Sequence, residues 1–333
     1  MSSTKALLIE FVLLAVLSLF ASSRFVIAFE RVGARLSLSE AALGLVVALG
    51  ADSPEIDSSI TALVHHQRGV SVDVILGANI FNFAALLGLG AISAGRITLD
   101  GRVVVLSGLP ALFVALTMLG LEHHGVGRWP AAGMLMGLLI PCSALLESPE
   151  RVLRMLHLPS AMSSLLERTV RLEERDLANV ISHKSGRTCD IYLASVMLIV
   201  VVGSSSVMER IASTVGDRNR WSNFVVGGVV LAGVASLPNA VAAIYLALHG
   251  RGAATLSTAM HSNVLNVMFG IIVPALFIGV GEQSRVGSDL ALWYLAMTVV
   301  ALSIAYLRRG LGRASGLIIV LVYLVFLFSM IHP

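Results

Sequence analysis

Charged residues are scarce in this chain. Asp, Glu, Lys and Arg make up 13% of the 333 residues, against about 25% in ordinary soluble domains. Apolar residues make up 56%, where roughly 45–50% is usual. A water-soluble protein has no means of hiding that much apolar surface. The composition therefore excludes a soluble enzyme and indicates an integral membrane protein.

The sequence also lacks the signatures of several other protein classes. Its two cysteines, Cys142 and Cys189, are too few for a disulfide framework and lack the spacing of a metal site. No Lys- or Arg-rich tract stands out, so nucleic acid is not an expected partner. An intramembrane protease with Asp52 and Glu55 as its acid pair is one alternative, but neither a His-Glu-x-x-His nor a Gly-x-Gly-Asp segment occurs. We therefore expect no enzymatic activity.

Long apolar runs recur from end to end. They favour transmembrane helices over the alternating segments of about ten residues that are typical of a transmembrane barrel. We expect an all-α, polytopic membrane protein with about ten transmembrane helices. The expected spans are 6–29, 39–65, 70–95, 103–121, 129–147, 190–212, 221–248, 255–280, 287–307 and 314–331. A signal peptide is an alternative for the first span, because Lys5 precedes an apolar stretch that reaches small residues.

The basic residues of the loops predict an orientation. With the N-terminus outside, sixteen of the 23 Lys and Arg residues fall in cytoplasmic loops, as the positive-inside rule favours. We expect a multi-pass protein of the plasma membrane, of the bacterial inner-membrane kind, with both termini outside. A cytoplasmic connecting loop, residues 148–189, would join a first half, residues 1–147, to a second half, residues 190–333.

The sequence repeats itself at a fixed offset of 184 residues. The aligned pairs include Val46 and Val230, Pro54 and Pro238, Asn79 and Asn263, and Asn82 and Asn266. The first copy opens on the second expected span and the second copy on the seventh, an odd number of crossings later. The two copies must therefore run through the membrane in opposite directions. Many secondary transporters use such inverted repeats for alternating access.

Two acidic residues lie inside the second expected span. Asp52 and Glu55 are three residues apart and so share a helix face. Between them, Pro54 is expected to break the helix and to free backbone carbonyl groups. A charged side chain at this depth costs about 2.5–3.5 kcal/mol on insertion scales, and no Lys or Arg falls in the middle of any expected span. We therefore expect a transported cation or proton here, whereas Asp57 lies on another face and is expected to be a packing residue.

These segments resemble those of a known family. Two helix breaks similar to Gly-Thr-Ser-Leu-Pro-Glu, each followed by a segment similar to Gly-Ser-Asn-Ile-Phe-Asn, are the alpha repeats of the sodium/calcium exchanger superfamily. The resemblance covers residues 40–95 and 225–280. It implies two inverted five-helix halves and the exchange of Ca²⁺ for Na⁺ or H⁺. The implied partners are inorganic cations and the lipid bilayer, and no cofactor is implied.

The resemblance also implies a set of ion ligands near the membrane midplane, between spans two, three, seven and eight. The implied ligands are the side chains of Asp52, Glu55, Asn82, Ser236, Asn239, Ser262 and Asn266 and the carbonyl groups of Ala48 and Ala232. The chain departs from the family pattern at Asn239, which replaces a second Glu, and at Ala51 and Ala78, which replace hydroxyl residues. Asp52 adds an acid where the family has a hydroxyl.

Three functions stay open at this point. The first is a secondary active antiporter that exchanges Ca²⁺ for Na⁺ or H⁺ by alternating access. The second is a Na⁺/H⁺ or other monovalent exchanger on the same scaffold, because two close carboxyl groups can share a proton. The third is a non-transporting descendant of an exchanger, which the departures at Asn239, Ala78 and Ala51 suggest.

Overall fold

The structure is a computed structural model that describes residues 4–35, 52–65, 67–123, 125–147, 187–222, 224–279 and 284–331. Its first half forms α1 (Thr4–Arg35), α3 (Ser53–Val64), α4 (Arg68–Asn82), α5 (Gly90–Ala94), α6 (Gly101–Glu122) and α7 (Arg128–Glu147). Its second half forms α10 (Thr188–Asn219), α11 (Ala232–Ala235), α12 (Leu237–Leu248), α13 (Gly252–Leu265), α14 (Val273–Ile278), α15 (Arg285–Leu307) and α16 (Arg313–Ile331). Three π-helices, η1 (Phe83–Leu89), η2 (Val225–Leu231) and η3 (Asn266–Ile272), connect α-helical pieces.

The polytopic helical architecture predicted from the sequence is confirmed. Seven helices in the described part of the chain are long and apolar enough to cross a membrane. The count rises to eight if Val225–Ala235 and Asn239–Leu248, which are bent by 47° against each other, form one span. Helix α7 covers the fifth expected span, whereas the first part of the second, residues 39–51, lies outside the described residues.

Some expected boundaries were wrong. Helices α1 and α10 have 32 residues each and run past the expected spans 6–29 and 190–212. Because α10 begins at Thr188, the end of the expected loop 148–189 is helical, and residues 148–186 lie outside the described residues. A short antiparallel ribbon was not expected. It pairs β1 (Arg96–Thr98) with β2 (Gly310–Gly312).

Helix ends follow local sequence signals. The side chain of Asp100 accepts a hydrogen bond from the Arg102 N–H at 2.8 Å and starts α6, as N-cap residues do. Gly95, with φ of 79°, ends α5, and Gly279, with φ of 93°, ends α14. Glycine is favoured at such helix ends because it adopts positive φ without strain. The two glycines are 184 residues apart, so the repeat extends to the ends of these spans.

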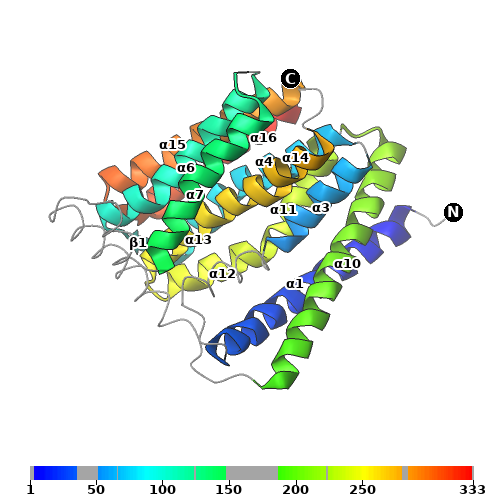
Figure 1. Cartoon of the computed structure of the whole chain (residues 1–333), viewed down its shortest axis with the longest axis horizontal. Coiled ribbons are helices and arrows are strands. Elements are labelled where there is room, and N and C mark those ends of the chain that lie inside the picture. Colours follow the sequence, from blue (N-terminus) through cyan, green and yellow to red (C-terminus); the bar gives the residue numbers. More distant parts are fainter. Residues whose placement is uncertain are drawn as a thin grey trace.

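Helices α1 and α10 form a pair along one side of the bundle (Figure 1). Phe25 and Ala28 of α1 pack against Ala194 of α10. Only 18% and 24% of their most apolar windows are buried, against 83% for the span Gly69–Ala94. The pair therefore exposes apolar surface suited to lipid, and the span that follows α3 lies in the centre of the fold.

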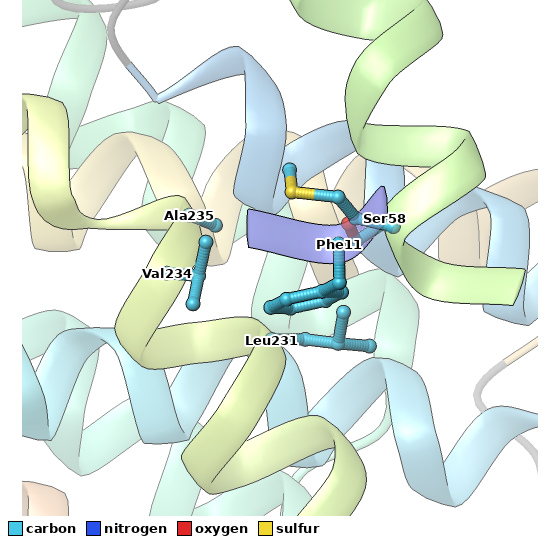
Figure 2. Close-up of a pocket in the computed structure, with 6 residues that line it drawn as sticks. Phe11, Ser58, Leu231, Val234 and Ala235 are labelled. Atoms are coloured by element: carbon cyan, nitrogen blue, oxygen red, sulfur yellow. The ribbon is translucent and has the colours of Figure 1, made fainter. Parts of the chain in front are cut away.

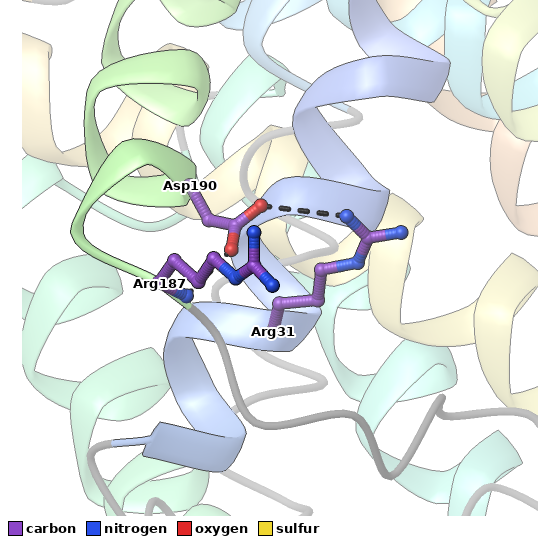
Figure 3. Close-up of polar contacts among 3 residues, drawn as sticks. All are labelled: Arg31, Arg187 and Asp190. Carbon is purple, nitrogen blue, oxygen red and sulfur yellow. Dashed lines mark hydrogen bonds and ion pairs between the residues drawn. The ribbon is translucent and has the colours of Figure 1, made fainter.

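A polar contact joins the ends of this pair (Figure 3). Arg31 Nη1 lies 3.4 Å from Asp190 Oδ1. Asp190 Oδ2 also accepts a hydrogen bond from the Arg187 backbone N–H at 2.7 Å, close to the start of α10. Because the Arg31 side chain is 40% exposed, solvent weakens the ion pair and it contributes little to stability.

The central helices approach closely where α4 crosses η2. A Cβ atom on Gly77 would lie 2.6 Å from the Cα atom of Gly228. Real Cβ atoms do not come this close to a backbone atom, so the crossing requires a glycine. Small residues are the usual means by which membrane helices approach each other.

Gly77→Ala is expected to destabilise the protein, because the added methyl group forces α4 and η2 apart. Overpacking of this kind costs about 1–3 kcal/mol. Thermal unfolding of the purified protein in detergent measures the effect as a lower melting temperature. Gly69→Ala is the matched control on the same helix, because nothing lies within 4 Å of its Cβ position. Equal melting temperatures for Gly77→Ala and Gly69→Ala would contradict this account of the crossing.

Candidate functional site

Two matching helix breaks place the acidic residues. Asp52 directly precedes α3 with φ, ψ of −83°, −4°, and Ser236 lies between α11 and α12 with −80°, −3°. Pro54 and Pro238 follow within the first turn of the new helix, where a missing N–H costs no helical hydrogen bond. The two breaks are thus equivalent in sequence offset and in backbone geometry.

Each break contacts the other through its polar side chains. Asp52 Oδ1 accepts hydrogen bonds from Asn239 Nδ2 at 2.5 Å and from Ser262 Oγ at 2.6 Å. Glu55 Oε1 accepts a hydrogen bond from Ser236 Oγ at 2.8 Å. Asp52 is the repeat equivalent of Ser236, and Glu55 is that of Asn239. The contacts 52–239 and 55–236 are therefore related by the pseudo-two-fold symmetry of the repeats.

A clamp of asparagines lies between α4 and α13. Asn79 Nδ2 donates to the Asn263 carbonyl oxygen at 2.9 Å, and Asn263 Nδ2 donates to the Asn79 carbonyl oxygen at 3.1 Å. Each residue also accepts at Oδ1: Asn82 Nδ2 donates to Asn263 at 3.0 Å, and Asn266 Nδ2 donates to Asn79 at 3.2 Å. All four bonds come in mirrored pairs, so the pseudo-two-fold axis passes between Asn79 and Asn263.

At this site, four buried side-chain oxygens have no hydrogen-bond partner among the described residues. They are Asp52 Oδ2, Glu55 Oε2, Asn82 Oδ1 and Asn266 Oδ1. Asp52 and Glu55 are both 0% exposed, and Asn82 and Asn266 are also buried. Unpaired oxygens of carboxylate and amide groups are the ligands that hard cations such as Ca²⁺ prefer. The arrangement is therefore suited to binding a cation with oxygen atoms from both repeats.

The charge at this site comes from two carboxylates. Among the described residues, the hydrogen-bond partners of Asp52 and Glu55 are the neutral side chains of Ser236, Asn239 and Ser262. No group of three or more His, Cys, Asp or Glu side chains in the described ranges is arranged to hold a metal ion. Neutral oxygens from hydroxyl, amide and carbonyl groups therefore have to complete the coordination of any bound cation.

Comparison with known proteins then identifies the family. A family profile described as "Sodium/calcium exchanger protein" matches residues 6–147 and 191–332. The chain belongs to the sodium/calcium exchanger family. The resemblance inferred from the sequence is therefore confirmed, and the exchanger is a multi-pass membrane protein of the cation antiporter type. The matched proteins are transporters, in line with the expectation that the chain is not an enzyme.

Two curated relatives and a solved structure are similar to the exchanger. CaxA of Alkalimonas amylolytica, named as a candidate antiporter, is 24% identical over 321 residues, with 93% of each chain covered. The sodium/potassium/calcium exchanger Nckx30C of Drosophila melanogaster is 26% identical over 136 residues, which span 39% of this chain and 15% of that protein. The sodium-calcium exchanger NCX_Mj, soaked with Na⁺, has the same fold, with a TM-score of 0.64 at 21% identity over 98% of this chain and 99% of that one.

The structure brings together most of the residues predicted for the site. Asp52, Asn239, Ser262 and Asn82 form one hydrogen-bonded chain, in which Asn239 Nδ2 and Asn82 Nδ2 each lie 3.3 Å from Ser262 Oγ. Glu55 and Ser236 form a separate pair. Asn266 joins through the asparagine clamp.

The two backbone carbonyl groups among the predicted ligands are not part of these side-chain contacts. The Ala232 carbonyl accepts the Ser236 backbone N–H at 3.1 Å, so one of its two lone pairs is used within the helix. Ala48 lies outside the described residues. Whether these two carbonyl groups coordinate the ion stays a prediction.

Other polar residues of the exchanger divide into those that join the site and those that do not. Asn79 and Asn263 were not among the predicted ligands, although their shared offset in the repeat was a usable signal. Asp57, expected on another face, accepts a hydrogen bond from Ser206 Oγ of α10 at 2.9 Å. Asp57 thus has its partner on α10, whereas Asp52 and Glu55 have theirs on the second helix break and α13, in agreement with the helix-face argument.

Proposed function

We propose that the exchanger moves Ca²⁺ across the membrane against Na⁺ or H⁺ by alternating access. The cation binds between α3, α4, the η2–α12 span and α13. The observation that carries this proposal is a set of four buried oxygens that have no hydrogen-bond partner among the described residues, two on the carboxylates of the first helix break and two on the asparagines at the ends of α4 and α13. Two carboxylates balance one divalent ion, and hydroxyl, amide and carbonyl oxygens supply the rest of the 6–8 ligands that Ca²⁺ prefers.

Electrostatics supports an ion at this place. Asp52 and Glu55 are buried at membrane depth, and hydrogen bonds from neutral groups do not cancel their charge. A carboxylate there is costly unless a counter-charge accompanies it. A cation that enters and leaves provides this counter-charge and accounts for two acids without a basic partner among their contacts.

A small hollow borders the site on the side of α1 and α10 (Figure 2). It measures about 10 Å³, and its lining includes Phe11, Ser58 and Ala235. Ala235 precedes Ser236 in the second break, and Ser58 follows Glu55 by one helical turn. A hollow of about this size approaches the volume that one water molecule needs. Widening here, as the α1–α10 pair shifts, would open the site to one face of the membrane.

The inverted repeat supplies two alternative states of similar energy. In this proposal, residues 1–147 and 190–333 are the two halves, joined by the cytoplasmic segment 148–189, and both termini lie outside. Because the contacts 52–239 and 55–236 are mirrored, a rearrangement that opens one side has an equivalent that opens the other. The same site is thereby exposed to each face in turn.

A monovalent exchanger on the same scaffold is the second candidate. Asn239 and Asn266 favour it, because two neutral amides stand where acids would bind a divalent ion more strongly. Two carboxyl groups in this site are able to take up Na⁺ or protons in place of Ca²⁺.

Flux in reconstituted liposomes tests both candidates. The purified full-length protein is sealed in vesicles, and Na⁺, proton and Ca²⁺ gradients are imposed one at a time. Uptake of radioactive Ca²⁺ driven by an outward Na⁺ or proton gradient is expected. Na⁺-driven proton movement without any Ca²⁺ uptake would favour the monovalent exchanger, and no flux under any gradient would point to a non-transporting descendant.

A further inference from the structure

Two ionisable side chains supply the negative charge of the site. Asp52 and Glu55 carry two negative charges when ionised, and the side chains that contact them are neutral. His261 precedes Ser262 in the sequence, but its Nδ1 atom lies 2.9 Å from Ser257 Oγ, one turn earlier on α13. Asp57 is bonded to α10 instead. With bound protons counted among the monovalent cations, the described residues therefore give the site a charge of minus two.

An uncompensated charge is unfavourable at this depth whichever sign it has. Hydroxyl and amide partners stabilise the carboxylates, but they leave the net charge unchanged. We call the cations bound at the site its load. The form of the protein that changes most readily from one access state to the other is therefore the form whose load cancels the charge of the site. A load of one divalent cation does so, and a load of two monovalent cations does so equally.

We infer that the exchanger carries a load of two positive charges in each direction, one Ca²⁺ against two monovalent cations, so that a full cycle moves no net charge. This inference rests on the proposed function and adds the stoichiometry to it. The amides of Asn239 and Asn266 keep the number of negative charges at the site at two, because a carboxylate at either position would add a third.

Asn239 is the residue that sets this load. It is the repeat equivalent of Glu55, and its Nδ2 atom donates to Asp52 Oδ1. A carboxylate at position 239 would face Asp52 directly and would make the site charge minus three. One Ca²⁺ would then leave one negative charge, whereas three monovalent cations would leave none. The two loaded forms would differ by one charge, and the exchange would respond to the membrane potential.

The test measures the final Ca²⁺ distribution in proteoliposomes as a function of potential. Valinomycin and a K⁺ gradient set the membrane potential. A constant Na⁺ or pH gradient, whichever of the two drives uptake, makes Ca²⁺ accumulate until its own concentration gradient stops further uptake. At the plateau, the concentration ratio of Ca²⁺ across the membrane is expected to equal the square of the concentration ratio of the driving ion. This ratio is expected not to change with potential. One net charge per cycle would instead shift the plateau about 50-fold for a potential of about 100 mV.

The outcomes separate this inference from the proposed function. A wild-type plateau that follows the potential overturns the inference and leaves Ca²⁺ antiport standing, whereas the absence of Ca²⁺ uptake under every gradient overturns both. For Asn239→Asp, the plateau is expected to shift about 50-fold over the same potential. For the neutral control Asn239→Gln, it is expected to stay independent of potential. An Asn239→Asp plateau that is unaffected by potential contradicts the role assigned to Asn239.

Discussion

Glu55→Gln is expected to abolish gradient-driven Ca²⁺ uptake. Glutamine has the size of glutamate and keeps an oxygen that can accept the Ser236 hydrogen bond, so the substitution removes charge with little change in shape. Ca²⁺ would then face a single carboxylate in a buried site. Removing one partner of a buried ion pair costs about 3–5 kcal/mol, so uptake at low Ca²⁺ falls by roughly 10²–10⁴-fold. Radioactive Ca²⁺ uptake into proteoliposomes measures this loss.

Asp52→Asn is expected to have the same effect, because Asp52 contributes the second carboxylate. The matched control is Asp57→Asn, the same substitution on α3, at a side chain that is bonded to Ser206 of α10. Asp57→Asn should transport like the wild type. Ca²⁺ uptake by Glu55→Gln or Asp52→Asn at the wild-type rate, with the protein correctly inserted, would contradict the proposed site.

Much of the fold was predictable because membrane helices leave strong sequence signals. Apolar runs located helices such as α6 and α15 to within a few residues of their ends. The inverted repeat was predictable from the alignment of Asn79 with Asn263 and of Pro54 with Pro238. These residues determine local backbone geometry or pair across the axis, and the same chemistry is required in both copies.

Other features leave no comparable signal. The π-helices η1 and η3 begin within one residue of Asn82 and Asn266, and their wider turns depend on tertiary packing that periodicity does not report. The β1–β2 ribbon joins segments more than 200 residues apart and is three residues long in each strand. The direction in which each asparagine amide points also depends on its partners, which only the folded chain brings together.

The structure explains how two departures of this chain from the family pattern are related. The resemblance implies a hydroxyl at position 52 and an acid at position 239, whereas this chain has Asp52 and Asn239. The structure places these two side chains in direct contact. The carboxylate has thus moved across one contact, from the second repeat to the first, and the number of acids in that contact is unchanged. The sequence alone shows that one acid is lost at position 239 and one is gained at position 52, and the structure adds that the two side chains are in contact.

Asn79→Ala and Asn263→Ala are each expected to reduce Ca²⁺ uptake strongly and to a similar extent. Asn263→Ala removes the hydrogen bonds of Asn263 with the Asn79 carbonyl and with Asn82 Nδ2, which keeps only its longer contact with Ser262 Oγ. Asn79→Ala removes those with the Asn263 carbonyl and with Asn266 Nδ2. A buried polar group without a partner costs about 1–3 kcal/mol. We expect about 10–100-fold lower apparent Ca²⁺ affinity, because the freed amide of Asn82 or Asn266 can turn its oxygen away from the ion.

The mirrored clamp also predicts how the two substitutions combine in a double variant. Because each asparagine orients the ligand asparagine of the opposite repeat, the double variant should lose less than the sum of the two single losses in free energy, as groups in one network do. Thr255→Val is the control on α13, because it removes a buried hydroxyl that donates only to the Arg251 carbonyl of the preceding turn. It should keep the wild-type affinity. Single variants that differ by more than about tenfold would show that the two asparagines do not act as equivalents, and the symmetric account of the site would then be wrong.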